Sequence, residues 1–237
     1  MIKIINKILS SNGYQLIDID LSNNSNNIFL FCPDSTSKRE EYFVTIQLDN
    51  QSDETAKELL EYKAEELFEN IKESGKVENY FVKNCTMLIC HNEELINRET
   101  IFSLEEDPYN FKKNVITYLP DELNDLEIFL KKNKITEISS LIISVIINGE
   151  NGKSFLDFKS NHEVSKNYYS LIIKIALKLP FVKYNPPQKK LINLSSEIEK
   201  SFNEKNYIIY KRLMDLEVQL TEDNIIQEVE QIWVDLI

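Results

Sequence analysis

The sequence predicts an α+β protein, in which a helix–three-strand–helix–strand mixed unit is followed by a mainly α-helical C-terminal region. Two observations predict this class. Runs of β-branched and aromatic residues recur within the first 91 residues, which is typical of strands. From residue 121 onward, apolar residues recur at helical spacing and prolines separate the runs. We expect residues 1–119 to form an α/β front unit and residues 120–237 a helical region, packed together as one compact chain.

The elements of the front unit follow from the spacing of its apolar residues. Ile2, Ile5 and Ile8 share one face of a helix that ends at Asn12-Gly13. The remaining predicted elements are, in chain order, strands at 14–20, 28–32 and 42–48, a helix at 52–73 and a fourth strand at 80–90.

The helical region contains six candidate helices. They are Asp121–Asn133, Ile135–Ile147, Glu163–Leu179, Leu191–Ser201, Glu204–Leu220 and Thr221–Leu236. The last one carries an apolar stripe that includes Trp233. Residues 213–237 also hold seven acidic residues and no Lys or Arg. This segment is either a solvated helix face or a docking helix, in which the stripe and Trp233 bind a basic partner surface.

The charge balance limits the classes of ligand. The 237 residues include 27 Lys and Arg against 39 Asp and Glu, which gives a net charge of −12. A sequence-independent grip on nucleic acid, or on an anionic membrane surface, is disfavoured because both depend on Lys and Arg. The apolar run at residues 141–147 is too short to span a bilayer, and no signal peptide is recognised. We expect a cytoplasmic protein that does not associate with membranes.

Two short motifs could carry chemistry, but each has a simpler interpretation. Gly149–Ser154 ends in Gly-Lys-Ser, yet a phosphate-binding loop would need a further glycine at Ile147, so a turn is favoured. Cys85, Cys90 and His91, with Cys32 as a conceivable fourth ligand, resemble part of a zinc site. Cys85 and Cys90 would point to opposite faces of the predicted strand, so we expect core packing and no metal or other cofactor.

The order of elements in the front unit resembles the core of the PD-(D/E)XK nucleases. That resemblance implies an acid near a strand start, for which Asp18, Asp20 and Asp34 are candidates, and an acid-x-Lys pair on the next strand. The strand at 42–48 has no such pair, and without it neither a metal nor an attacking water is held. A divergent metal-dependent nuclease therefore stays an alternative only.

The segment Leu104–Tyr118 is the most distinctive in the chain. It contains, in order, an acidic pair, the sequence Asp-Pro followed by an aromatic residue, the sequence Phe-Lys-Lys, and a stretch with β-branched residues. This pattern resembles the middle component of bacterial ABC-three-component anti-phage defence systems, the group that includes the C-type accessory subunit of Lamassu systems. The matching positions are Glu105, Glu106, Asp107, Pro108, Tyr109, Phe111, Lys112 and Lys113.

The resemblance implies a non-enzymatic subunit that bridges an SMC/RecN-like DNA-sensing ATPase and an effector, expected to be a nuclease, and holds the effector inactive until DNA is sensed. The partners would be these two subunits, with DNA bound only through the complex. An acidic immunity or antitoxin-type module that blocks a basic toxin is the alternative.

The same segment also has a purely structural interpretation. Pro108 fixes a turn after three acidic residues, and Tyr109 and Phe111 share one face if the chain between them is extended. Such a turn could form a partner interface together with Trp233, or it could anchor the front unit on the helices, since paired aromatic residues usually pack.

Overall fold

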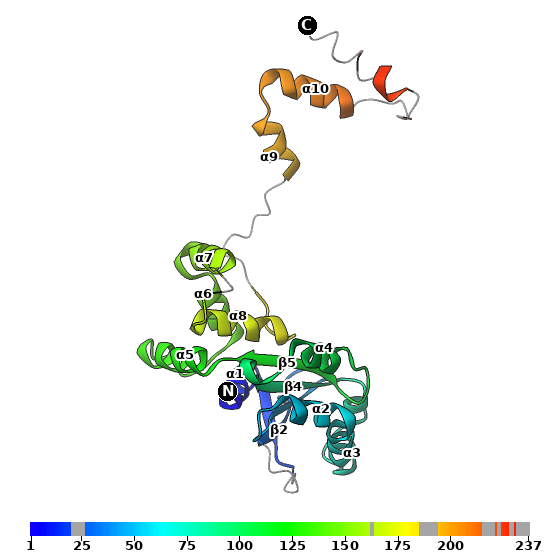
Figure 1. Ribbon diagram of the computed structural model, residues 1–237, viewed down its shortest axis with the longest axis vertical. Helices are drawn as coiled ribbons and strands as arrows, with labels where there is room; N and C mark the ends of the chain where they lie inside the picture. The colour runs from blue at the N-terminus through cyan, green and yellow to red at the C-terminus, as the bar shows by residue number, and fades with distance from the viewer. Residues whose placement is uncertain are drawn as a thin grey trace. The chain divides into compact units, whose positions relative to one another are not determined.

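The computed structural model describes residues 1–19, 27–161, 164–184, 194–214, 221, 224–227 and 230 (Figure 1). The chain divides into two compact units, Met1–Pro187 and Gln188–Ile237. Among the residues described, no helix is long and apolar enough to cross a membrane.

The first unit is built on a five-stranded mixed sheet whose spatial order follows the chain order. Its strands are β1 (Tyr14–Ile17), β2 (Asn27–Pro33), β3 (Tyr42–Gln47), β4 (Cys85–Asn92) and β5 (Lys112–Tyr118). β2 runs antiparallel to β1 and β3, whereas β4 is parallel to β3 and β5 is parallel to β4. The predicted α+β class is confirmed, with β5 added as an edge strand.

Two hydrophobic cores lie on the two faces of this sheet. Neighbouring residues of β3 alternate between them, because successive side chains of a strand point to opposite faces: Phe43 belongs to one core and Val44 to the other. Helices α2 (Asp53–Glu58), α3 (Ala64–Glu73) and α4 (Arg98–Glu106) pack in the core of Val44. Helices α1 (Ile2–Ser11), α5 (Pro120–Lys132), α6 (Ser140–Ile147) and α8 (Tyr168–Lys178) pack in the core of Phe43 (Figure 1).

The division between compact units differs from the expected boundary at residue 119. Leu126 of α5, Ile143 of α6 and Ile172 of α8 share one continuous core with Phe43 and Leu88 of the sheet. These helices complete the layer that α1 begins, because a sheet with two apolar faces needs cover on both. The structure therefore places the division at residues 187 and 188.

The short elements refine the prediction. The helix expected at 52–73 is α2 and α3 joined by a π-helical turn (Leu59–Lys63), and 3₁₀ turns occupy Asn79–Val82, Glu93–Leu95 and Gly149–Gly152. The helix expected from Ile135 begins at Ser140, because the Ser139 hydroxyl accepts a hydrogen bond from the N–H of Ile142 and caps it there. Helix α7 (Lys153–Asn161), helix α4 and strand β5 were not predicted.

The second unit contains α9 (Leu194–Ser201) and α10 (Glu204–Met214). Both lie within predicted helices, and the structure describes α9 only from Leu194 and α10 only to Met214. Most of the helix expected at Thr221–Leu236, and Trp233 with it, lies outside the described residues.

Ion pairs of lysine residues attach α8 to α5 and to the residue that follows β4. The carboxylate of Glu122 is fully buried at the start of α5, and the Nζ of Lys174 donates to its two oxygens at 3.1 and 2.9 Å. Lys174 also pairs with Glu93, which follows β4, and Lys166 donates to Glu93 at 2.8 Å. The hydroxyl of Ser170 completes the network by donating to Glu122. A buried carboxylate is stable only with such partners, so the network fixes how α8 crosses the sheet.

We predict an acid-dependent loss of stability from this network. Burial by itself would raise the pKa of Glu93, but the hydrogen bonds from Lys166 and Lys174 outweigh it and hold that pKa below its unfolded value of 4.5. The pairing is therefore fully stabilising above the unfolded pKa and is lost as the pH falls through the folded pKa. The variant Glu93→Gln should be less stable than the wild type near neutral pH, and the difference should shrink below about pH 4.5.

Urea unfolding at a series of pH values measures this difference. Glu94→Gln is the matched control, because Glu94 is exposed and makes no ion pair among the described residues. The free energy of unfolding of Glu94→Gln should change with pH in the same way as that of the wild type. If the free energy of unfolding of Glu93→Gln differed from that of the wild type by a constant amount down to about pH 3, the stabilising role of the ionised Glu93 would be contradicted.

Candidate functional site

The distinctive segment Leu104–Tyr118 comprises the last residues of α4, a tight turn and the whole of edge strand β5. α4 packs beside β5 in the core of Val44, and Leu104, Phe111 and Val115 are buried there. The matching positions thus sit on one continuous feature, a helix that turns directly into the edge of the sheet.

A buried ammonium group organises the turn. The side chain of Lys113 is fully buried, and its Nζ pairs with the carboxylate of Asp107. The same Nζ donates to the carbonyl oxygens of Tyr109 at 2.7 Å and Phe111 at 3.3 Å. A buried charge is costly unless its hydrogen-bonding capacity is used. The three acceptors meet that requirement, and together they fix the backbone from residue 107 to residue 111.

Tyr109 and Phe111 do not share a face, which corrects the expectation for an extended chain. Asn110 lies between them with φ of 64°, in the left-handed region, and the N–H of Phe111 donates back to the carbonyl oxygen of Tyr109 at 2.7 Å. This reversal separates the two rings. Phe111 is 1% exposed and packs edge-on against Phe68, whereas Tyr109 is 72% exposed.

Glu105 occupies a backbone hydrogen-bond donor at the edge of the sheet. Its Oε1 accepts the backbone N–H of Val115 in β5 at 2.8 Å. Its two oxygens also accept hydrogen bonds from the Nζ of Lys178 at 2.5 and 2.7 Å, and the Asn114 side chain donates to the carbonyl oxygen of Lys178 at 2.8 Å. An unpaired edge N–H is a template for strand addition. Glu105 therefore occupies an edge donor and links β5 to the end of α8.

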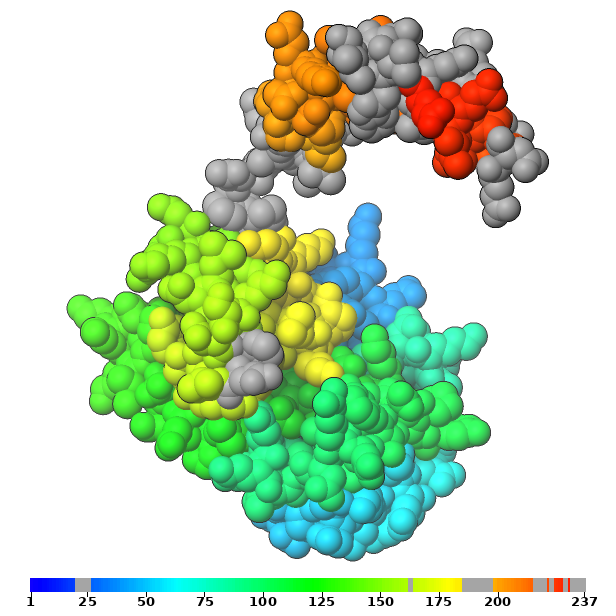
Figure 2. Space-filling model, turned by 45° about the horizontal axis from the view of Figure 1, so that its top comes forward, coloured from blue at the N-terminus to red at the C-terminus, as the bar shows by residue number. Residues whose placement is uncertain are grey.

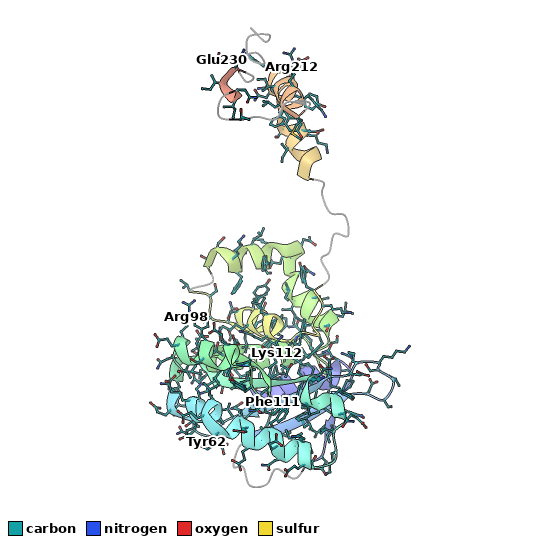
Figure 3. All side chains as sticks on the ribbon, turned by 90° about the vertical axis from the view of Figure 1, so that its right-hand side faces the viewer. Tyr62, Arg98, Phe111, Lys112, Arg212 and Glu230 are labelled. Atoms are coloured by element: carbon teal, nitrogen blue, oxygen red, sulfur yellow. The ribbon has the colours of Figure 1, made fainter. Side chains whose placement is uncertain are left out.

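The structure divides the sequence-predicted interface residues into two groups. Glu105, Asp107, Phe111 and Lys113 hold the chain's own fold. Glu106, Pro108, Tyr109 and Lys112 are exposed to solvent. Phe111, the residue before β5, and Lys112, its first residue, are both labelled in Figure 3. A partner can reach only the second group in this state, and Trp233 lies outside the described residues.

Sequence reasoning missed one exposed aromatic residue nearby. Phe102 is 46% exposed on α4, and the guanidinium of Arg98 lies 5.2 Å from its ring centroid. Phe102 and Glu106 are four residues apart and therefore share one face of α4. The Arg98–Phe102 spacing on a predicted helix could have revealed this pair, but α4 was not predicted. We call Phe102, Glu106, Pro108, Tyr109 and Lys112 the Tyr109 surface.

Residues 41–142 match the family model of the ABC-three component (ABC-3C) system Middle Component 1. This match supports the family that the Leu104–Tyr118 segment resembles. It spans 102 of the 237 residues, a little under half of the chain. No curated protein and no solved structure matches the chain.

The middle-component region, residues 41–142, corresponds to a defined part of the fold. It runs from the residue before β3 through α2, α3, β4, α4, β5 and α5 into the start of α6. It thus includes the whole Tyr109 surface and the buried Lys113 ion pair. Lys174 and Lys178, which bind the region's Glu122 and Glu105, come from α8 outside it.

The cysteines in the middle-component region are packing residues. Cys85 lies in the core of Val44 and Cys90 in the core of Phe43, so the two thiols point to opposite faces of β4, as predicted. Burial raises the pKa of the Cys85 thiol well above its usual value and that of Cys90 to about 12. His91 is fully buried beside Cys90 in the chain, and Nε2 of its ring has no hydrogen-bond partner among the described residues. Among all the residues that the structure describes, no group of three His, Cys, Asp or Glu residues is placed to hold a metal ion.

The polar residues of β3 serve the fold. Thr45 donates its hydroxyl hydrogen to the side-chain oxygen of Asn6 at 2.7 Å, and the side chain of Gln47 accepts the N–H of Ile2 at 2.9 Å. β3 carries no carboxylate and no lysine. Asp34 follows β2 and accepts hydrogen bonds from Thr36, which lowers the pKa of its carboxyl. Asp18 follows β1, and Asp20 lies outside the described residues.

Gly149–Ser154 forms the turn that its simpler interpretation predicts. Residues 149–152 are a 3₁₀ turn between α6 and α7, in which Glu150, Asn151 and Gly152 all have positive φ. Two consecutive non-glycine residues in the left-handed region make this a strained connection.

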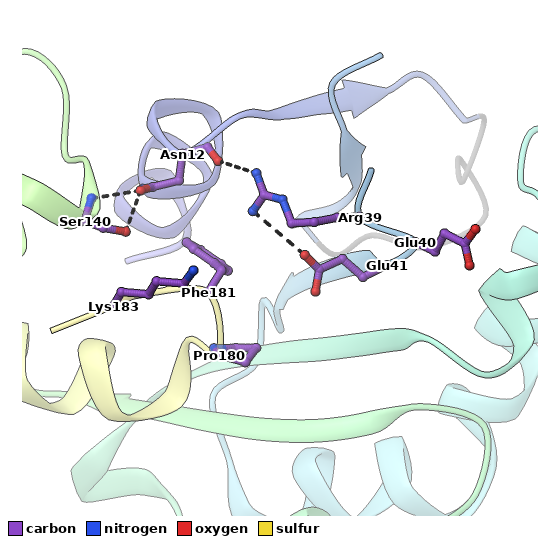
Figure 4. A pocket seen from close by; sticks show the side chains of 8 residues that line it. All are labelled: Asn12, Arg39, Glu40, Glu41, Ser140, Pro180, Phe181 and Lys183. Atoms are coloured by element: carbon purple, nitrogen blue, oxygen red, sulfur yellow. Dashed lines mark hydrogen bonds and ion pairs between the residues drawn. The ribbon is translucent and has the colours of Figure 1, made fainter. Parts of the chain in front are cut away.

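A polar pocket of about 580 Å³ lies beside the first turn of α6 (Figure 4). It is lined by Asn12, Arg39, Glu40, Glu41, Ser140, Pro180, Phe181 and Lys183. The guanidinium of Arg39 donates to the hydroxyl of Tyr14 at 2.8 Å and to the carbonyl oxygen of Asn12 at 3.1 Å, and lies 3.9 Å from Glu41. The pocket carries two positive and two negative side chains, and this balance selects no ligand class.

We predict that removing the buried ammonium destabilises the whole first unit. Lys113→Met keeps most of the side-chain volume but removes the ammonium from the carboxylate of Asp107 and from the carbonyl oxygens of Tyr109 and Phe111. Breaking one side of a buried ion pair costs roughly 3–5 kcal/mol. Urea unfolding should show a loss of free energy of that size.

The neighbouring Lys112→Met is the matched control, because Lys112 is exposed and surface substitutions stay within about 0.5 kcal/mol. If Lys113→Met and Lys112→Met unfolded at the same urea concentration, the ammonium would not organise the turn.

Proposed function

We propose that the chain is a non-enzymatic interaction subunit of an ABC-three-component anti-phage defence system. In this proposal it bridges an SMC/RecN-like DNA-sensing ATPase and an effector, and it holds the effector inactive until DNA is sensed. It acts in the cytoplasm, as a C-type accessory subunit of the Lamassu kind. The family match carries the proposal, and the Tyr109 surface within the matched residues supports it.

The Tyr109 surface has the chemistry of an interface hot spot. Tyrosine, arginine and tryptophan dominate binding energy at protein interfaces, and Tyr109 is the most exposed of the aromatic side chains in the middle-component region. Its carbonyl oxygen is held by Lys113, so its backbone is fixed before a partner arrives. A fixed backbone lowers the entropy lost on binding.

The net charge of the chain supports a complex in which another subunit binds the DNA. A protein with a net charge of −12 is not suited to grip DNA by itself, so DNA would be bound by the ATPase. The acidic surface would steer the chain to basic surfaces of its partners.

We predict that Tyr109→Ala weakens binding to one partner about 10- to 30-fold, which corresponds to a hot-spot loss of about 2 kcal/mol. The chain and the proposed ATPase and effector subunits of its system are purified separately, and the affinity of the chain for each of them is measured. Tyr62→Ala is the matched control, because Tyr62 is an exposed aromatic residue at 49% that lies outside the Tyr109 surface. It should bind both partners like the wild type.

Binding of both variants at wild-type strength would remove the Tyr109 surface from the proposal. Recovery of one small basic toxin in place of the ATPase and effector would favour the immunity-type module instead.

A further inference from the structure

A second polar pocket lies on the first unit and shares no residue with the Tyr109 surface. It has a volume of about 210 Å³, and its lining comes from α7, from the first turn of α8 and from the chain between these helices. Figure 2 shows the yellow-green surface of α7 beside the yellow surface of α8. We call this cavity the α7–α8 pocket.

Three aromatic rings line the α7–α8 pocket, those of Phe158, Tyr168 and Tyr169. The ring centroid of Tyr169 lies 5.7 Å from that of Phe158 and 6.5 Å from that of Tyr168, with interplanar angles of 54° and 83°. The rings are therefore set at large angles to one another around the pocket. Because the face of an aromatic ring is negative, such a set of rings attracts a cation.

The polar part of the lining consists of hydrogen-bond acceptors and one negative charge. The charge is the carboxylate of Asp157, which is exposed and makes no ion pair or side-chain hydrogen bond with any described residue. The hydroxyls of Ser154 and Ser165 and the amides of Asn161 and Asn167 complete the described lining. All of these groups have oxygen atoms that can accept hydrogen bonds. Among its described residues, the pocket thus offers a charge and acceptors for a cation and contains no cation of its own.

Hydrogen bonds and stacking fix the walls of the pocket before a ligand arrives. The side-chain oxygen of Asn167 accepts the N–H of Tyr169 at 2.9 Å and caps α8. The hydroxyl of Tyr169 donates to the carbonyl oxygen of Ile147 at 2.7 Å, and the ring of Tyr168 stacks on Phe129 with centroids 4.2 Å apart. Groups that are fixed in advance lose little entropy on binding.

The size of the pocket indicates a single side chain as its ligand. Pockets for drug-sized ligands have volumes of about 300–1,000 Å³, and this one is smaller. Arginine fits the lining better than lysine, because its planar guanidinium stacks on aromatic rings and presents five donors to several acceptors. Arginine is also enriched among the residues that dominate binding energy at protein interfaces.

We propose that the α7–α8 pocket binds an arginine side chain supplied by a partner subunit of the same system. The inference rests on the proposed function and adds to it a second docking surface and its chemistry. The guanidinium pairs with the carboxylate of Asp157, and its plane and aliphatic stem contact the rings of Phe158 and Tyr168. The net charge of −12 favours the approach of such a basic partner surface.

The first test measures the affinity of the full-length chain for the proposed ATPase and effector subunits, each purified separately. Asp157→Asn should weaken binding to one of them about 10-fold or more and reduce its dependence on salt concentration, because the guanidinium loses its counter-charge. Asp157→Glu, which keeps the charge, should bind that subunit more tightly than Asp157→Asn does. Asp157 is exposed, so neither substitution disturbs the core.

Asp125→Asn is the matched control for the loss of one negative charge. Asp125 is exposed on α5 and does not line the pocket. Since surface substitutions outside an interface have small effects, this variant should bind both subunits within about 2-fold of the wild type.

The second test needs no partner. Methylguanidinium chloride, titrated into the full-length chain, should shift the NMR signals of the Tyr168 and Tyr169 rings in a saturable way. Asp157→Asn should abolish the saturation. Methylammonium chloride should bind more weakly than methylguanidinium, because its compact ammonium group has no plane that stacks on the rings.

Three results would overturn the assignment of the pocket. Wild-type affinity of Asp157→Asn for both subunits, with Tyr109→Ala still weakened, would remove the pocket from the interface and leave the proposed function intact. The absence of a saturable shift with methylguanidinium would show that the pocket is not a cation site. Tighter binding of methylammonium than of methylguanidinium would identify the ligand as lysine and exclude arginine.

Failure of the proposed function has a different signature. If the wild-type chain bound neither the ATPase nor the effector, the bridging role and the partner's arginine would both be excluded, even if methylguanidinium still bound to the pocket.

Discussion

The buried ammonium group of Lys113 determines much of the surrounding structure. A charge removed from water must find acceptors nearby, and those available are the carboxylate of Asp107 and the carbonyl oxygens of Tyr109 and Phe111. To bring these three groups to one point, the chain must turn sharply between α4 and β5. That turn sends Phe111 into the core and leaves Tyr109 in solvent, so the position of the exposed ring follows from the position of the buried charge.

The same principle explains how the helices outside the family match are attached. Lys174 and Lys178 lie one helical turn apart on α8 and pair with Glu122 and Glu105 of the middle-component region. These pairs combine with the apolar residues of α8 to fasten it over the sheet. Because one face of α8 packs on the sheet, its other face remains to line an apolar groove of about 450 Å³ with α6 and α7.

A subunit that joins two partners needs two separate surfaces. α4, which carries part of the Tyr109 surface, packs in the core on one face of the sheet, and α6 and α8, which form part of the groove, pack in the core on the other face. The two surfaces also differ in chemistry, since one presents the exposed rings of Phe102 and Tyr109 and the other is an apolar groove.

The sequence by itself determined the α+β class, the order of the first six elements, most helices after residue 119 and the distinctive character of Leu104–Tyr118, because periodicity and turn residues are local signals. It also predicted that Cys85 and Cys90 face opposite sides of their strand. Only the tertiary structure decided that β5 is a strand and that helices α5, α6 and α8 belong with the sheet, because both depend on pairing and burial between distant residues. The tertiary structure also decided that Lys113 and Phe111 are buried whereas Lys112 and Tyr109 are exposed. The sequence could not show this, because two lysines, or two aromatic residues, of the same segment look alike until the chain has folded.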